Sequence, residues 1–139
     1  MPSTKTLAEL IQRKHEVLVR LCNIGRQQVR LIDDGETSTL LQLLSAKQNM
    51  ISSLQQLERE MAPYQAEDPE TRVWPNPADR ALCASQAEEC NQMLEQIVAM
   101  ERNSADRITA RRNEVAAQLK HIYAATQARD AYSAHRARS

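Results

Sequence analysis

Two apolar seams in residues 7–61 mirror each other about a short polar turn. The first seam contains Leu7, Leu10, Lys14, Val17, Leu21, Ile24, Gln28 and Leu31, and the second contains Leu40, Leu43, Lys47, Met50, Leu54, Leu57 and Met61. Their spacing alternates between three and four residues, which keeps each seam on one side of an α-helix. When the chain folds back at residues 34–36, the two seams face each other in register. The sequence therefore predicts a long, coiled-coil-like antiparallel helical hairpin.

The predicted fold class is all-α, with a longer third helix that completes an elongated three-helix bundle. The chain of 139 residues has no Phe and only two Gly, a composition typical of long helices rather than strands. We expect one domain, residues 1–139, with helices at about 5–33, 38–61 and 78–128. A linker is expected at 62–77 and a tail at 129–139.

The predicted linker holds four of the five prolines and the only tryptophan. Proline lacks a backbone N–H, so Pro63 is expected to end the second helix and Pro77 to lie in the first turn of the third. Repeated proline makes this segment stiff rather than flexible. We interpret Trp74 as a clamp on the base of the hairpin, and a secondary contact with a partner is the alternative.

The third helix continues the apolar pattern over its whole length. Its stripe contains Leu82, Cys90, Leu94, Ile97, Ser104, Ile108, Val115, Leu119 and Ile122. An unbroken helix over residues 78–128 would be roughly 75 Å long, whereas a hairpin arm of about 29 residues is only about 43 Å long. We therefore expect the hairpin to cover this stripe only as far as about residue 106.

The uncovered part of the stripe is predicted to be an interaction surface, because exposed apolar stripes commonly mark one. Its candidate partner-binding residues are Ile108, Val115, Leu119, Ile122 and Tyr123. Three arrangements are compatible with the sequence. The stripe binds another protein, it pairs with its own copy in a dimer, or the helix breaks near Asn103 and Ser104 and folds back.

Charge and hydropathy argue against several other classes of protein. The 18 basic and 18 acidic residues cancel, which disfavours a whole-surface role with nucleic acid or membrane. No apolar run approaches the length of about 20 residues that spans a bilayer, and the first ten residues lack the apolar core of a signal peptide. The odd number of cysteines, three, favours a reducing cytoplasm, with each thiol acting as a small buried hydrophobe.

The sequence also lacks the motifs of a catalytic or metal site. None of the three histidines belongs to a Glu-x-x-His pair, and there is no Cys-x-x-Cys pair, zinc-protease motif or glycine-rich phosphate loop. We therefore expect no enzyme activity, no metal and no cofactor. Lys14 and Lys47 fall on the seams, where we expect their stems to pack while the ammonium groups reach water.

The hairpin segment resembles the FlgN family of flagellar export chaperones over about residues 7–61. In that family a long first helix ends in a Leu-Ile pair, a glycine and an acidic residue, followed by a leucine pair, a lysine and further leucines. The matching residues here are Leu31, Ile32, Gly35, Glu36, Leu40, Leu43, Leu44, Lys47, Ile51, Leu54 and Leu57.

The resemblance implies an all-helical cytoplasmic chaperone that binds the C-terminal helical regions of hook-filament junction proteins. We expect the chain to be a monomer or weak homodimer. Such a chaperone delivers these clients to the flagellar type III export apparatus, and its third helix engages them. The resemblance does not extend past residue 62, so the stripe residues named above come from the spacing argument alone. The alternative function is a self-associating coiled-coil scaffold or adaptor without chaperone activity.

Overall fold

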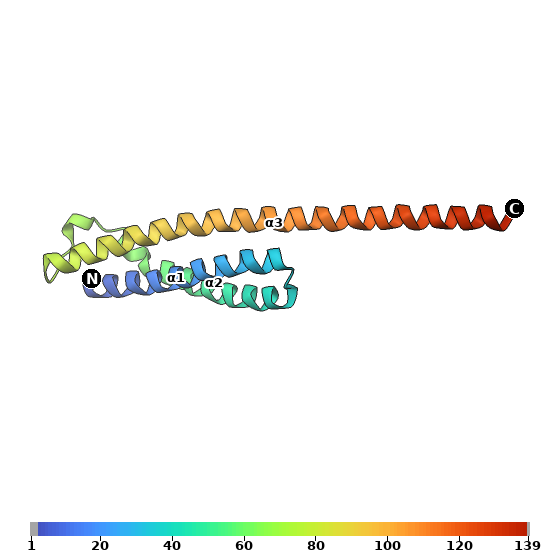
Figure 1. Ribbon diagram of the computed structural model, residues 1–139. Coiled ribbons are helices and arrows are strands. Elements are labelled where there is room, and N and C mark those ends of the chain that lie inside the picture. Colours follow the sequence, from blue (N-terminus) through green and yellow to red (C-terminus); the bar gives the residue numbers. More distant parts are fainter. Residues whose placement is uncertain (1–2, 139) are drawn as a thin grey trace. The chain divides into compact units, whose positions relative to one another are not determined.

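The structure is all-α over the residues that it describes. The computed structural model describes residues 3–138, with side chains up to residue 136. It contains α1 (Thr4–Asp34), α2 (Thr37–Gln65), a 3-10 turn η1 (Pro69–Thr71) and α3 (Pro77–Arg138), with no strand in the described range (Figure 1). The predicted fold class, a helical hairpin with a longer third helix, is confirmed.

The chain divides into two compact units, which are described separately below. The first unit, residues 1–104, contains α1, α2, η1 and the first part of α3, and we call it the bundle. The second unit, residues 105–139, contains the rest of α3, and we call it the C-terminal unit.

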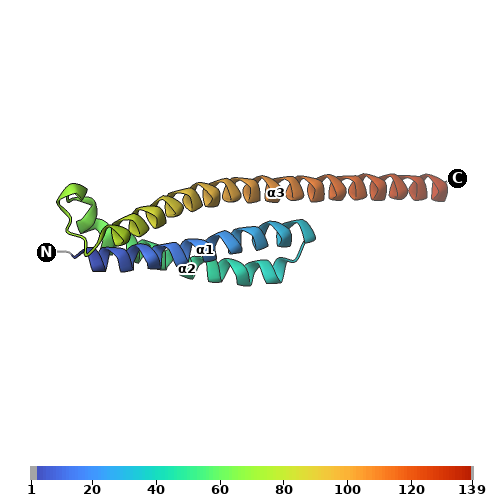
Figure 2. The same ribbon diagram turned by 60° about the vertical axis from the view of Figure 1, so that its left-hand side comes forward.

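The hairpin turn lies where the sequence predicts it. Gly35 follows α1 with φ of 69°, a left-handed conformation that glycine adopts without a Cβ clash. The Gly35 N–H donates to the Ile32 carbonyl and the Glu36 N–H donates to the Leu31 carbonyl, the two bonds of a Schellman motif. The helix α2 begins two residues later, so α1 and α2 lie side by side and antiparallel, as both views show (Figures 1 and 2).

The second helix does not end at Pro63, which corrects the predicted linker of residues 62–77. It runs through Pro63 to Gln65, and the linker contains a short 3-10 turn at Pro69–Thr71. Arg72 accounts for this ending, because its guanidinium donates 2.8 Å to the Tyr64 carbonyl and 2.7 Å to the Glu67 carboxylate. A side-chain donor thus satisfies a carbonyl that the helix end leaves open.

The bundle core consists of two clusters that take residues from all three helices. The cluster at the hairpin base contains Leu7, Leu10, Ile11, Leu57, Met61, Tyr64 and Cys83. The next cluster along the bundle contains Leu18, Leu21 and Cys90, with Met50, Leu54, Met93 and Ile97 packed against it. Leu82, expected on the stripe, is instead 59% exposed, because Cys83 lies seven residues before Cys90 and takes the core position.

The helix α1 packs on α3 through a face that the seam pattern does not include. His15 pairs with Glu89 at 2.5 Å, and the Cys22 thiol lies 3.9 Å from the Met93 carbonyl. A Cβ on Gly25 would lie 3.0 Å from the end of the Met100 side chain. The glycine therefore permits a close approach between α1 and α3, which is the compensation expected for its cost in a helix.

The ammonium groups of the seam lysines are paired with carboxylates, contacts that the expectation from sequence did not include. Lys47 donates 3.1 Å to the amide oxygen of the buried Gln28 and also binds Glu101, so one ammonium group joins all three helices. Lys14 pairs with Glu58 at 2.6 Å, and both lysine side chains are less than 15% exposed. A carboxylate from a neighbouring helix thus pairs with each ammonium group.

The third helix is longer than predicted. Asn76 caps its start by accepting from the Asp79 N–H at 2.9 Å, with Pro77 at the first helical position. The helix ends at Arg138, so most of the predicted tail at 129–139 is helical. The ten alanines and the lack of Gly or Pro after residue 104 favour helix. It also continues through Asn103 and Ser104, so the alternative in which the helix breaks at these residues is not observed.

We predict that the Lys47 bridge stabilises the bundle. Lys47→Met leaves the buried Gln28 amide without its donor and should lower the free energy of unfolding by about 1–3 kcal/mol. The double variant Lys47→Met, Gln28→Leu removes both partners and should recover most of this loss. Urea unfolding followed by the fluorescence of Trp74 reports on the bundle alone.

The matched control is Lys120→Met, which removes a lysine from an exposed position in the C-terminal unit. It should leave the urea midpoint unchanged. A midpoint for Lys47→Met equal to that of the wild type would show that the bridge adds nothing to stability.

Candidate interaction surface

One face of α3 changes from buried to exposed after Ser104. Cys90 and Ser104 on this face are buried and Ile97 between them is half-buried, whereas Ile108 and Val115 are exposed. These residues are separated by intervals of seven or of four, which place them on the same side of the helix. The change falls at the boundary between the bundle and the C-terminal unit, close to the predicted residue 106.

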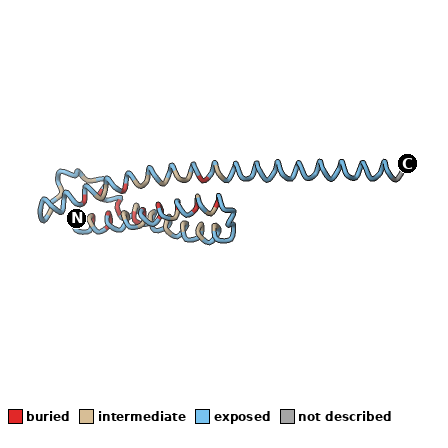
Figure 3. Tube along the Cα trace, viewed as in Figure 1, coloured by how far each residue is buried: buried red, intermediate tan, exposed pale blue. Residues whose placement is uncertain are grey.

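The five predicted partner-binding residues are all exposed. Ile108, Val115, Leu119, Ile122 and Tyr123 have between 49% and 64% of their surface accessible, and Tyr132 is equally open. The C-terminal unit is exposed throughout its described side chains apart from the half-buried Arg107 (Figure 3). We call Ile108, Val115, Leu119, Ile122 and Tyr123 the apolar stripe. Large exposed apolar residues that follow one helix face form a surface that a partner helix can cover.

Ser104 is the last buried residue before the apolar stripe. It is 2% exposed, and its hydroxyl finds no hydrogen-bond partner among the described residues. A buried hydroxyl without a partner lowers stability. Ser104 therefore fits this position because its side chain is small, and not because its hydroxyl makes a polar contact.

Trp74 lies on the base of the bundle, as the clamp interpretation requires. Its half-buried side chain packs against the cluster that includes Leu7, Tyr64 and Cys83. The Thr4 hydroxyl donates 2.7 Å to the carbonyl of neighbouring Val73, which holds the linker against the start of α1. Trp74 also lines a groove of about 380 Å³ between α1 and the start of α3, beside the exposed Leu82.

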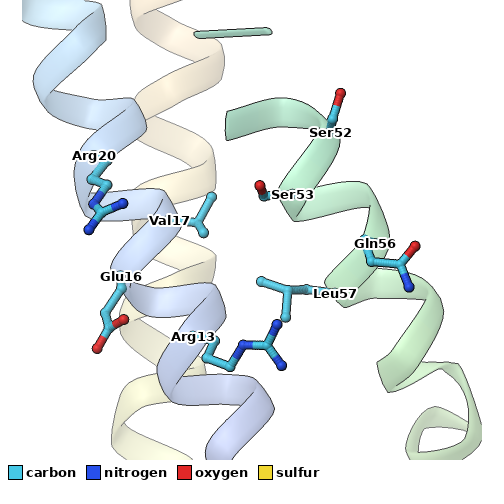
Figure 4. Close-up of a pocket in the computed structure, with 8 residues that line it drawn as sticks. All are labelled: Arg13, Glu16, Val17, Arg20, Ser52, Ser53, Gln56 and Leu57. Carbon is cyan, nitrogen blue, oxygen red and sulfur yellow. The ribbon is translucent and has the colours of Figure 1, made fainter. Parts of the chain in front are cut away.

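A second groove runs along the outer side of the hairpin. It has a volume of about 460 Å³, with Val17 and Leu57 as its apolar part and Ser52, Ser53 and Gln56 on the α2 side (Figure 4). Arg13, Glu16 and Arg20 line the α1 side, and Arg13 lies 3.7 Å from Glu60. The groove is lined by charges of both signs and by two short serines. It contains no group that would select one ligand over another.

The cysteines are unreactive by their surroundings. Cys22, Cys83 and Cys90 are free and buried. Burial raises the pKa of each thiol above its ordinary value, since a thiolate would lose its solvation, and nearby Arg26, Arg72 and Lys14 offset this only in part. The thiols are therefore protonated near neutral pH, and they act as small hydrophobes, as predicted.

Within residues 3–136 no group of three His, Cys, Asp or Glu side chains lies close enough to hold a metal ion. None of the described helices is long and apolar enough to cross a membrane.

The chain matches no family model, no curated protein and no solved structure. The indications of function therefore come from the side chains of this chain.

The structure shows contacts that the sequence reasoning missed. The His15–Glu89 pair and the Lys47–Glu101 pair both join α3 to the hairpin. The seam pattern pairs α1 with α2 and identifies no charged partner for α3. The signal that could have revealed them is a second apolar set on α1, Ile11, Leu18, Cys22 and Ile32, which is buried in the structure.

We predict that Trp74 stabilises the bundle and does not bind the partner. Trp74→Ala removes a half-buried indole and should lower the free energy of unfolding by about 2 kcal/mol, roughly half the cost at a fully buried site. Val73→Ala is the matched control, because Val73 is its neighbour and is largely exposed. Unfolding is measured by circular dichroism in urea. Loss of partner binding with unchanged stability would instead make Trp74 a contact residue.

Proposed function

We propose that this chain is a cytoplasmic export chaperone of the FlgN type. In this proposal it binds the C-terminal helical region of flagellar hook-filament junction proteins and keeps them from associating early. It then delivers them to the flagellar type III export apparatus. The partners are thus protein clients and components of that apparatus, without nucleic acid or membrane insertion.

The observation that carries the proposal is the exposed apolar stripe of the C-terminal unit. Its residues each leave about half or more of their surface in water. Covering a side chain of this size fully is worth roughly 1.5–3 kcal/mol, so a partner helix that covers the remaining half of each gains several kcal/mol over the stripe. The flagellar assignment depends on the sequence resemblance over residues 7–61, which fold as the hairpin with its Gly35–Glu36 turn.

An unfolded export client is a suitable occupant of this stripe. Helix-on-helix recognition needs apolar residues at intervals of three and four, which both the stripe and an amphipathic client segment supply. A client that is disordered when free loses conformational entropy on binding. This loss lowers the affinity per unit of buried area and allows release at the export apparatus.

A second candidate function is a self-associating scaffold, because the same exposed stripe could pair with its own copy. A monomer or weak homodimer supports the chaperone, whereas a tight dimer that a client does not dissociate supports the scaffold. Sedimentation at micromolar protein concentration, with and without client, distinguishes the two.

We predict that Val115→Asp combined with Leu119→Asp abolishes client capture. Two carboxylates in the apolar stripe would be buried without partners on binding. The measurement is a pull-down of C-terminal segments of hook-filament junction proteins by the full-length chain. Helical content by circular dichroism should stay the same, because both positions are exposed.

The matched control is Ala117→Asp with Ala124→Asp, which adds two carboxylates to the opposite side of the same helix. This variant should bind like the wild type. Equal binding by all three proteins would remove the apolar stripe as the client site. Failure of the wild-type chain to capture any of these segments would contradict the proposed function itself.

A further inference from the structure

We infer that the partner of the apolar stripe is an amphipathic helix with acidic residues at both ends of its apolar face. The inference depends on the proposed function, because it takes the stripe as the docking site. It adds the charge pattern of the partner, which neither the hairpin nor the stripe specifies.

The C-terminal unit is basic although the whole chain is neutral. It has seven basic residues, Arg107, Arg111, Arg112, Lys120, Arg129, Arg136 and Arg138, and three acidic ones, Asp106, Glu114 and Asp130. The bundle has the remaining 11 basic and 15 acidic residues. Even if each acidic residue of the C-terminal unit pairs with a basic one, four positive charges remain.

The basic residues bracket the apolar stripe rather than run along it. Arg107, Arg111 and Arg112 lie at its first end, and the other three arginines follow Tyr123, while only Glu114 and Lys120 carry full charges between these groups. The stripe from Ile108 to Tyr123 is about 22 Å long. Arg112 and Arg129, at the inner edges of the two groups, are 17 residues apart, so acidic residues that complement both must be separated by about five turns of a partner helix.

Two exposed arginines are placed to meet such a partner. Arg112 follows Ile108 by four residues and precedes Val115 by three, so it lies on the same side of the helix as the stripe. Arg129 follows Ile122 by seven residues and continues that side beyond the apolar part. A partner helix on the stripe passes both guanidinium groups.

The charge pattern disfavours stripe-to-stripe pairing of two copies. In a parallel pair each basic end meets its own copy, and in an antiparallel pair the first basic end meets the second. Both arrangements bring like charges together, which is destabilising. An acidic partner is favoured over self-association for this reason.

The pattern is also a poor match to an anionic membrane surface. A helix that lies in the interface usually has lysine or arginine along its polar face and Trp, Phe or Leu along the other. Here the C-terminal unit has no Trp or Phe, and Lys120 is the one basic residue between Arg112 and Arg129. An acidic helix is therefore the expected partner of the stripe. Membrane binding is the alternative that the experiment below also measures.

The experiment measures binding of the full-length chain to three designed helical peptides by fluorescence anisotropy. The peptides share one apolar stripe and carry either Glu, Gln or Lys at both ends. The Glu-ended peptide should bind about tenfold more tightly than the Lys-ended one, and its affinity should fall as the salt concentration rises. Vesicles containing anionic lipid are tested in parallel.

A pair of charge-reversal variants separates the two ends from the rest of the helix. Arg112→Glu with Arg129→Glu should weaken binding of the Glu-ended peptide by about tenfold and strengthen that of the Lys-ended peptide. Lys120→Glu is the matched control, because it reverses a charge away from the stripe, and it should change neither affinity by more than about threefold.

Equal binding of all three peptides, or no binding of the Glu-ended peptide, would overturn the inference. Stronger binding to anionic vesicles than to the Glu-ended peptide would overturn it in favour of a membrane surface. These outcomes are distinct from failure of the proposed function, which is judged by capture of client segments and by the Val115 and Leu119 variant. A stripe that captures clients regardless of their end charges would keep the function and remove the charge pattern.

Discussion

The bundle depends on α1 being packed on two faces at once. On the α2 side, Lys14 pairs with Glu58 and Gln28 accepts from Lys47. On the α3 side, Gly25 lies against Met100 and Cys22 lies near the Met93 carbonyl. A two-helix hairpin would leave the second face in water, so the first part of α3 is needed to complete the core. The Lys47 bridge connects the two sides, since its ammonium group binds residues of α1 and α3 together.

The hairpin could be predicted from sequence because its signals are local. Alternating spacing of three and four defines each seam, and Gly35 supplies the left-handed conformation that ends α1. The ending of α2 could not be predicted in the same way. Proline is a local signal against helix, but Arg72 satisfies the Tyr64 carbonyl from eight residues away and the helix continues past Pro63. A distant side chain outweighed the local preference.

The behaviour of the seam lysines shows the same limit. Snorkelling is the expected outcome when a lysine has only one neighbouring helix, because the free side is water. Lys47 has a second neighbour, and its ammonium group pairs with Glu101 of α3. The pairing of α3 with the hairpin cannot be read from either seam, so the seams alone do not identify this carboxylate. The exposure of Ile108 and Val115 could be predicted, since it required only the lengths of the helices.

The composition of the apolar stripe bears on how tightly it can hold a partner. Interfaces with high affinity concentrate their binding energy in buried Trp, Tyr and Arg residues, whereas the stripe has four aliphatic side chains and Tyr123 as its only aromatic anchor. The free energy gained by covering the stripe is spread over about 22 Å of helix. Ordering an unfolded partner would offset much of that gain. Basic groups at both ends raise the association rate more than they slow dissociation. If the stripe docks acidic helical segments as proposed, this composition favours fast association and ready release, which suits a transient complex better than a permanent one.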